Sequence, residues 1–243
     1  MPELIEISIV KELKKIFKKG FIKSLRSNNT GIGYTLETIL GIKENNDAEP
    51  DFLFENTPIE LKSQREHTSS NITIFTLEPP RRTKADFMDL KLLKKFGYIR
   101  EGRKNLYVTM QMDKFNPQGF KLKLDDSENL LIIHKEAGII WTYPIDYIFA
   151  KIKKKLSHKV LLVTAESKET EEGEFFHYKK GDLFSEVTEK GFIELIKSNS
   201  LVVEFRMHIG VKEGREWARN HGTGFRLNLR HLDKLFVKRK KIL

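Results

Sequence analysis

The chain has 243 residues, of which 39% are hydrophobic and 32% are charged, and Lys and Arg outnumber Asp and Glu by 44 to 34, for a net charge of +10. This composition is typical of a soluble globular protein and excludes a largely disordered chain. The absence of cysteine excludes disulfides and a thiol nucleophile. Since no apolar run is long enough to span a bilayer, we expect a cytoplasmic protein.

The predicted elements begin with helices and continue with short strands. Apolar residues at helical spacing predict a helix over 3–26, with Leu4, Val10, Leu13, Phe17, Phe21 and Leu25 on one face. The segment "NNTGIGYTLETILG" predicts a second helix, capped by Asn or Thr and ended by Gly41. Alternating patterns predict strands at 51–55, 59–63 and 72–79, the first two joined by a turn at Asn56-Thr57-Pro58.

The remaining two thirds of the chain mixes both element types. A buried strand with the sequence "KVLLVTAES" follows a predicted helix, and a polar loop separates the last two strands. Helix, three strands, helix and strand together predict an α/β core with a mixed sheet, to which 100–145 and the chain after 168 are additions. The predicted elements are helices at 86–96, 145–156 and 186–197, and strands within 105–145 and at 159–167, 201–210 and 223–229.

Basic residues are concentrated in a few short runs. An excess of positive charge favours a polyanionic partner, of which nucleic acid is the most common in a cytoplasm. Lysine-rich solvated surfaces also occur for solubility or thermal adaptation, which is the alternative interpretation. The runs are at 11–19, 79–84, 151–159 and 238–241.

The stretch "PDFLFENTPIELKSQREH" contains a candidate metal site. Because side chains alternate along a strand, Glu60 and Lys62 should point to one side while Ile59 and Leu61 enter the core. Pairing of the two strands would bring Asp51 next to Glu60, and two close carboxylates favour a divalent cation between them. Mg²⁺ binds one or two carboxylates and phosphate oxygens, which suits phosphodiester hydrolysis. Lys62 would then orient the attacking water and offset charge on the phosphate.

The Glu-x-Lys pattern alone is unspecific. It occurs three times in the chain, and only Glu60-Leu61-Lys62 has an Asp and a turn before it. Glu37, on the preceding helix, is a candidate for a further metal or water contact. The alternative is a solvated hairpin edge with an incidental ion pair.

Several blocks, in order, resemble the MvaI/BcnI family of type II restriction endonucleases, which are relatives of the MutH nicking endonuclease. The resemblance covers about residues 28 to 230, with a divergent middle. The blocks are "NTGIGYTLETIL", "DAEPDFLFENTPIELKS", "TIFTLEP", "VLLVTAESK", "EFRMHIG" and "HGTGFRLN".

The resemblance implies a PD-(D/E)xK nuclease fold, with a mixed central sheet flanked by helices and an added DNA-recognition lobe. It maps catalytic positions onto Glu37, Asp51, Glu60 and Lys62, with Asp51 and Glu60 as ligands of Mg²⁺. We expect Mn²⁺ to replace Mg²⁺, and Ca²⁺ to support DNA binding without cleavage. One departure from the family pattern is the longer spacing between Asp51 and Glu60, which leaves the placement of Asp51 open.

The family's organisation also implies an architecture and partners. These enzymes resemble monomeric clamps that close around short pseudopalindromic sites in double-stranded DNA and cut one strand at a time. A DNA methyltransferase that protects the host would be a functional partner, without a stable complex. We expect one nuclease domain over 1–243, with 1–85 and 145–168 as catalytic core and 86–144 and 169–243 as recognition elements.

Arginine and histidine residues near the C-terminal end are candidates for reading bases, because arginine bonded to guanine is the most common specific contact. The family blocks fall on Arg206, His221 and Arg226, and Arg215 lies in the same segment. Arg65 and His67 follow the Glu-x-Lys strand and are weaker candidates for groove contacts. For each of them the alternative is a phosphate contact or a surface charge.

Three functions fit these observations. The first is a site-specific restriction endonuclease, the second a MutH-like nicking or repair endonuclease, and the third a DNA-binding protein of the same fold that does not cleave. Retention of all four catalytic residue types argues against the third.

Overall fold

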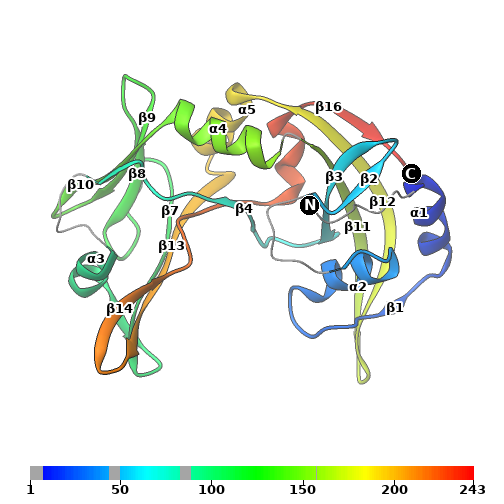
Figure 1. Cartoon of the computed structure of the whole chain (residues 1–243), viewed down its shortest axis with the longest axis horizontal. Helices are drawn as coiled ribbons and strands as arrows, with labels where there is room; N and C mark the ends of the chain where they lie inside the picture. The colour runs from blue at the N-terminus through cyan, green and yellow to red at the C-terminus, as the bar shows by residue number, and fades with distance from the viewer. Residues whose placement is uncertain (1–7, 44–49, 83–88, 157) are drawn as a thin grey trace. The chain divides into compact units, whose positions relative to one another are not determined.

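In the computed structural model, the chain folds into two compact units, and each unit is built from more than one chain segment (Figure 1). The first unit comprises Met1–Ser70, Lys155–Thr188 and Leu235–Leu243, and the second comprises Asn71–Lys154 and Glu189–Lys234. The first unit therefore lacks the segments 71–85 and 145–154 of the expected catalytic core, and it includes residues after 168. The structure describes residues 8–43, 50–82, 89–156 and 158–243.

The first unit is a mixed sheet with helices packed against it. Its strand order is β1-β12-β11-β3-β2, with β16 paired to β12. β3 and β11 are parallel, and the other pairs are antiparallel. The elements are α1 (Ile9–Lys18), β1 (Ile22–Lys23), α2 (Gly31–Ile39), β2 (Phe52–Phe54), β3 (Thr57–Arg65), β11 (Lys159–Thr170), β12 (Gly173–Val187) and β16 (Phe236–Lys241).

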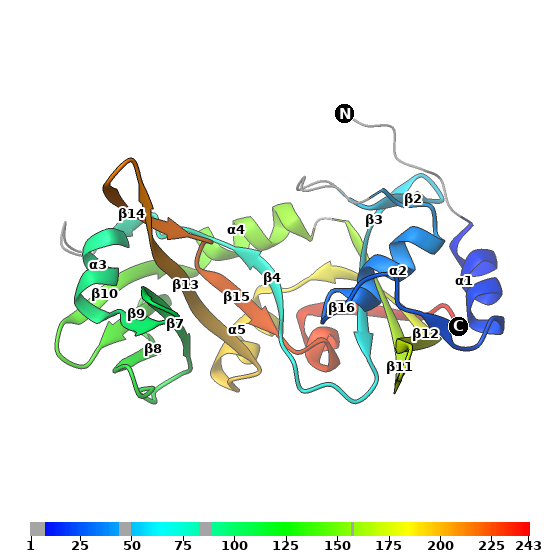
Figure 2. The same cartoon turned by 90° about the horizontal axis from the view of Figure 1, so that it is seen from below.

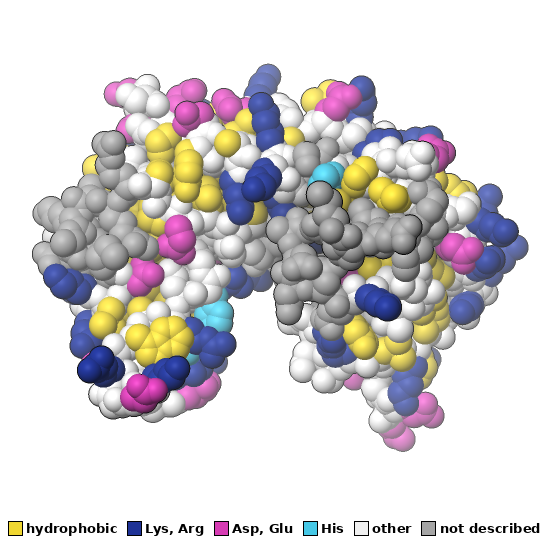
Figure 3. All heavy atoms as spheres, in the orientation of Figure 1, with side chains coloured by type: hydrophobic (Ala, Val, Ile, Leu, Met, Phe, Trp, Pro, Cys, Tyr) yellow, Lys and Arg dark blue, Asp and Glu magenta, His cyan; other side chains and the backbone are white. Residues whose placement is uncertain are grey.

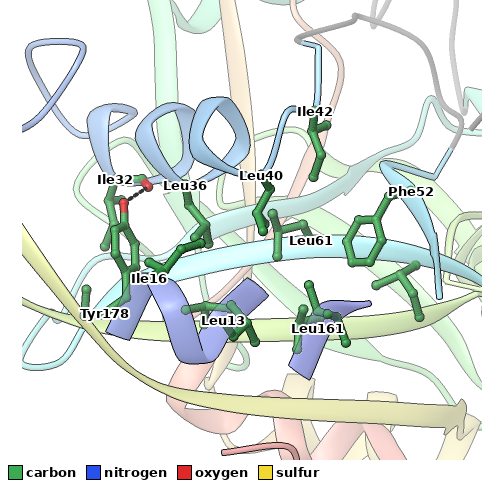
Figure 4. Packing of buried hydrophobic residues seen from close by; sticks show 14 of the residues in the cluster. Leu13, Ile16, Ile32, Leu36, Leu40, Ile42, Phe52, Leu61, Leu161 and Tyr178 are labelled. Carbon is green, nitrogen blue, oxygen red and sulfur yellow. Dashed lines mark hydrogen bonds between the residues drawn. The ribbon is translucent and has the colours of Figure 1, made fainter. Parts of the chain in front are cut away.

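The core of this unit lies between the sheet and both helices. α1 packs against β12 and α2 against β3, and Figure 2 shows both helices beside these strands. Leu13 of α1, Leu36 of α2, Leu61 of β3 and Leu161 of β11 belong to one buried cluster, shown from close by in Figure 4. Because Ile59 and Leu61 both enter this cluster, strand alternation turns Glu60 and Lys62 to the opposite side of β3.

The second unit contains two sheets, ordered β4-β15-β13-β7-β6 with β14 paired to β13, and β5-β10-β9-β8. Aromatic side chains join their facing sides: the ring of Phe205 lies 5.6 Å from that of Phe120 and 4.7 Å from that of Trp141. The strands are β4 (Ile72–Thr76), β5 (Arg81–Arg82), β6 (Tyr98–Arg100), β7 (Arg103–Met110), β8 (Phe120–Leu124), β9 (Asn129–His134), β10 (Gly138–Pro144), β13 (Leu201–Lys212), β14 (Arg215–Asn220) and β15 (Gly224–Leu227). The helices are α3 (Asp89–Phe96), α4 (Ile145–Lys155), α5 (Glu189–Lys197) and the 3₁₀ helix η2 (Leu229–Leu235).

The first predicted helix is shorter than expected. It ends at Lys18, and Gly20 follows with φ of +71°, a conformation that favours glycine and stops the helix. Phe21 and Leu25 are therefore exposed, at 43% and 54%, and do not extend the buried face. Leu4 lies outside the described residues. The second helix has Thr30 at its N-cap, but no side chain makes the expected capping bond.

Three strand predictions were wrong in their pairing or position. The segment predicted at 72–79 contains β4, which pairs with β15 of the second unit and not with the sheet of the first unit. The core instead uses β12, a segment that the sequence pattern treated as an addition. The first hairpin turns at Glu55 and Asn56, which both have positive φ, so Thr57 and Pro58 already belong to β3. The expected polar loop after 210 contains β14.

No helix within the described part of the chain is long and apolar enough to cross a membrane.

Candidate active site

Asp51 is held beside Glu60 by the β2–β3 hairpin. The backbone N–H of Asp51 donates a hydrogen bond of 2.9 Å to the carbonyl of Ile59. Its carboxylate oxygen Oδ2 accepts a bond of 2.5 Å from the backbone N–H of Leu61. These two bonds engage the residues on either side of Glu60, so the backbone itself brings the two carboxylates together.

Glu60 is a buried carboxylate with two ammonium groups on one of its oxygens. The residue is only 4% exposed. Lys62 Nζ donates to Glu60 Oε1 at 2.6 Å, and Lys155 Nζ lies 3.5 Å from the same oxygen. Since a buried charge is costly unless it is paired, the two lysines offset the cost of burying the Glu60 carboxylate.

The electrostatics of Asp51 reflect this arrangement. Burial raises the pKa of the Asp51 carboxyl above its usual value, and the negative charge of Glu60 raises it further. The Leu61 N–H bond and the charges of Lys62 and Lys155 oppose that rise. Two carboxylates that repel each other are typical of a cation-binding site, because a cation between them would relieve the repulsion.

Glu37 lies near this strand without joining the pair as a third ligand. A Cβ added to Gly33 would lie 3.5 Å from Ser63 Oγ and 3.7 Å from Glu37 Oε1, which places Glu37 beside the residue that follows Lys62. Within residues 8–43, 50–82, 89–156 and 158–243, no three His, Asp or Glu side chains are grouped as metal ligands. Among the described residues, Glu37 thus lies near Ser63 and is not grouped with Asp51 and Glu60.

Asp51 and Glu60 fit a Mg²⁺ ion without a third ligand from the protein. Mg²⁺ in nucleases and polymerases is held by one or two carboxylates and completes its shell with waters and phosphate oxygens. Asp51 and Glu60 supply two hard oxygen donors, held by buried backbone bonds on one side of the sheet.

The second unit presents a polar sheet face, defined by Glu204, Arg206 and His208 of β13 with Tyr107 of β7 and Arg226 of β15. The β13 residues alternate with Phe205, which enters the aromatic core, and therefore point to the other side. The hydroxyl of Tyr107 lies 3.2 Å from His208 Nδ1. Figure 3 shows histidine beside Lys and Arg side chains over this region of the unit.

Arg206 and His221 meet on this polar sheet face. Arg206 Nη2 donates to the carbonyl of His221 at 3.5 Å, and Arg206 Nε is buried with no hydrogen-bond partner among the described residues. The ring centroid of His221 lies 5.7 Å from that of His208. Burial lowers the pKa of His221, and the charges of Arg219 and Arg206 lower it further. His221 is therefore neutral near pH 7.

Arg226 has a different environment. Its Nη1 bonds both carboxylate oxygens of Glu204, at 3.0 and 2.8 Å, and its Nη2 donates to the carbonyl of Asn71. Thr109 Oγ1 donates to the same Glu204 at 3.1 Å. Both Nη groups of Arg226 are thus bonded within the protein, while its Nε is buried without a partner among the described residues.

The remaining candidates for DNA binding, Arg65, His67 and Arg215, do not belong to the polar sheet face. Arg65 makes a two-point ion pair with Glu174, with bonds of 2.5 and 2.6 Å, and stays within the first unit. His67 follows β3 as an exposed residue, and Arg215 is exposed at the start of β14.

The sequence reasoning missed Lys155 and the contact between Tyr107 and His208. Lys155 belongs to the basic run at 151–159, where the residue type alone did not distinguish it from its neighbours. The useful signal was its position just before β11, because β11 is the parallel neighbour of the Glu-x-Lys strand.

The chain is similar to known proteins over nearly its whole length. The model of the MvaI/BcnI restriction endonuclease family matches residues 10–236. The solved structure described as a restriction endonuclease MvaI–cognate DNA substrate complex is 25% identical, with a TM-score of 0.76 and 97% of each chain covered. The structure of restriction endonuclease MvaI in the absence of DNA is 22% identical, with a TM-score of 0.55 and 96% of each chain covered, and supports the fold alone. No curated protein matches the chain. Because the family model matches residues 10–236, most of both units, this chain belongs to the MvaI/BcnI restriction endonuclease family, whose members are hydrolases that cut DNA.

Proposed function

We propose that this protein is a Mg²⁺-dependent type II restriction endonuclease of the cytoplasm. It hydrolyses double-stranded DNA at a short pseudopalindromic site that contains G·C pairs, and it acts as a monomer on one strand at a time. The observation that carries the proposal is the buried Glu60 beside Asp51, with Lys62 2.6 Å from Glu60, in a member of this family. A methyltransferase of the same specificity would protect the host DNA.

The chemistry follows from the charges of the site. Bound to Asp51 and Glu60, Mg²⁺ would polarise phosphate oxygens and lower the pKa of a bound water. Asp51 and Glu60 provide the negative charge that selects a cation, and the hairpin backbone orients them before DNA binds. Lys62 places an ammonium group next to the metal ligands, where it orients the attacking water and stabilises the negative charge that develops on the phosphate. Glu37, beside Ser63, supports this water network.

The polar sheet face of the second unit supports sequence readout in this proposal. Arg206 combines an unpaired buried Nε with a weak bond to the His221 carbonyl, so a guanine edge can compete for its guanidinium. His221, neutral and exposed, can accept or donate a bond to a base. Arg226 acts chiefly by fixing Glu204 in the face, and Arg215 and His67 are left as exposed candidates for phosphate contacts. Arg65, paired with Glu174, supports the strand that carries Lys62.

The test is digestion of a long natural DNA with purified protein in Mg²⁺, followed by sequencing of the ends. The expected result is cutting of both strands at one short sequence, abolished by a chelator and by Glu60→Gln, which controls for contaminating nucleases. Nicks in one strand only would instead indicate a MutH-like enzyme. Specific DNA binding without cleavage in either Mg²⁺ or Mn²⁺ would indicate a non-cleaving protein and overturn the proposal.

A further inference from the structure

Lys155 brings a second ammonium group to the candidate active site. Its Nζ lies 3.5 Å from Glu60 Oε1, the same oxygen that Lys62 contacts at 2.6 Å. The two lysine side chains are similarly enclosed, at 24% and 27% exposure, while the Glu60 side chain is at 6%. Two cationic groups from distant parts of the sequence therefore converge on one carboxylate oxygen.

Lys155 belongs to the first unit, like Glu60, and lies close in sequence to β11. α4 ends at Lys155, and β11 begins at Lys159 and runs parallel to β3, with Val160 beside Glu60. Leu156, the next residue, is only 5% exposed and anchors the chain at this point. Within the first unit, buried Leu156 and Val160 follow Lys155 in the chain, and Val160 pairs with Glu60.

The charge balance gives this contact a role. Asp51 and Glu60 contribute two negative charges, and Lys62 alone would offset only one of them. With Lys155 the four groups balance before any cation binds, and both lysines act electrostatically on Asp51 as well. A cation that binds Glu60 must share or displace these ammonium groups, and the displaced charge then lies where a phosphodiester would meet the site.

We propose that Lys155 competes with the metal ion for Glu60 and adds positive charge beside the scissile phosphate. The proposal rests on the function proposed above for Asp51 and Glu60. The proposal predicts two opposite effects of removing Lys155. The protein should bind the metal ion more tightly, because a competing cation is lost. It should cleave DNA more slowly, because the phosphate loses a stabilising charge. A purely structural ion pair would produce neither effect.

The experiment compares Lys155→Gln and Lys155→Met with wild type and with Lys168→Gln. Lys168 is exposed to solvent on β11, eight residues beyond Val160, the strand partner of Glu60, so its replacement removes the same charge away from Glu60. Mn²⁺ binding to the protein without DNA is measured from the loss of the free-ion electron paramagnetic resonance signal. Cleavage is measured under single-turnover conditions in Mg²⁺ at saturating DNA, and thermal unfolding confirms that each variant is folded.

Both Lys155 variants should bind Mn²⁺ about fivefold more tightly than wild type. They should cleave at least about tenfold more slowly. Lys168→Gln should stay within about twofold of wild type in both measurements, because solvent screens its charge. Lys155→Arg, which keeps the charge, should restore wild-type Mn²⁺ affinity.

Unchanged or weaker Mn²⁺ binding by the folded Lys155→Met protein would overturn the role of Lys155, even if the wild type cleaves DNA. Unchanged cleavage by that variant would do the same. Failure of the wild type to cleave any DNA, or to bind Mn²⁺ in a manner that depends on Asp51, would instead overturn the proposed function itself.

Discussion

Arg206 and Arg226 are the same residue type on neighbouring strands, yet their contacts assign them different roles. Arg226 is enclosed by Glu204 and the Asn71 carbonyl, and its side chain is 29% exposed. The Nε of both arginines is buried without a partner among the described residues, but the Nη groups of Arg206 make only one bond there, of 3.5 Å. The first arrangement stabilises the unit, and the second leaves hydrogen-bonding capacity for DNA.

We therefore predict opposite effects for alanine at these two positions. Arg226→Ala should lower the free energy of unfolding by about 1–3 kcal/mol, because the partly buried carboxylate of Glu204 loses its ion-pair partner. Arg206→Ala should leave stability nearly unchanged and weaken binding to the cognate site by about 1–3 kcal/mol, with a smaller loss on scrambled DNA. Denaturant unfolding and binding titrations on both duplexes measure these effects. Arg215→Ala, at an exposed position, is the control for loss of charge. Equal losses on both duplexes for Arg206→Ala would assign it to the phosphate backbone.

At the scale of elements, the sequence predicted the local pieces better than their pairing. The alternation of "PIELK" correctly placed Ile59 and Leu61 in the core, because period-two burial is a local property of a strand. The strand at 72–76 was also found, but its partner is β15, more than a hundred residues away in the sequence, and nothing in its own pattern identifies that partner. β12 was missed because its alternation is interrupted by Lys179, Lys180 and Gly181.

The candidate site likewise contains residues that the sequence brought together and a residue that only the fold brings close. Asp51, Glu60 and Lys62 lie on one hairpin, so the turn and the alternation were enough to bring them together as a prediction. Lys155 reaches Glu60 only through the parallel pairing of β11 with β3, which is a property of the whole sheet. The ion pair between Glu204 and Arg226 could not be predicted from the sequence either, because it depends on the antiparallel register of β13 and β15.

His134, at the end of β9, should make the second unit sensitive to acid. It is 3% exposed, its Nε2 donates to the Gln118 carbonyl at 3.1 Å, and its Nδ1 accepts from the Glu136 N–H at 3.2 Å. Burial lowers the pKa of His134 below its usual value. Protonation would also place a hydrogen on Nδ1, where it would face the N–H of Glu136. Because the unfolded chain binds the proton more readily, stability is complete above pH about 6.5 and is lost as the pH falls below it.

The measurement is amide hydrogen exchange in β8 and β9 at pH 7.5 and 5.5, corrected for the intrinsic exchange rates. Protection should fall at the lower pH in the wild type. His134→Leu should be less protected at both values but should change less between them, since the titrating group is gone. An identical pH response in the variant would show that other groups, such as His208 and His231, cause the loss.

At the scale of the whole molecule, the net charge of +10 provides attraction to DNA that does not depend on sequence. Lys153, exposed on α4 with its ammonium 4.9 Å from the Phe149 ring centroid, is a candidate for such a contact. Lys153→Gln should weaken binding to all duplexes by the same factor and reduce the salt dependence of log K by about 0.9, as expected for one lost phosphate contact. Titrations at several salt concentrations test this. A loss confined to the cognate duplex would contradict it.

The central claim is that the Asp51, Glu60 and Lys62 arrangement performs hydrolysis, and Lys62→Met tests it most directly. Lys168→Met is the matched control, because Lys168 is the exposed lysine of another Glu-x-Lys pattern on a strand. DNA binding is measured in Ca²⁺, and cleavage is measured in Mg²⁺ under single-turnover conditions on the same DNA. Lys62→Met should cleave at least about a hundredfold more slowly, while its affinity for DNA changes little, because the ammonium group acts mainly on the transition state. Lys168→Met should match the wild type in both. Cleavage by Lys62→Met at the wild-type rate, or an equal loss of binding and cleavage, would contradict the assignment.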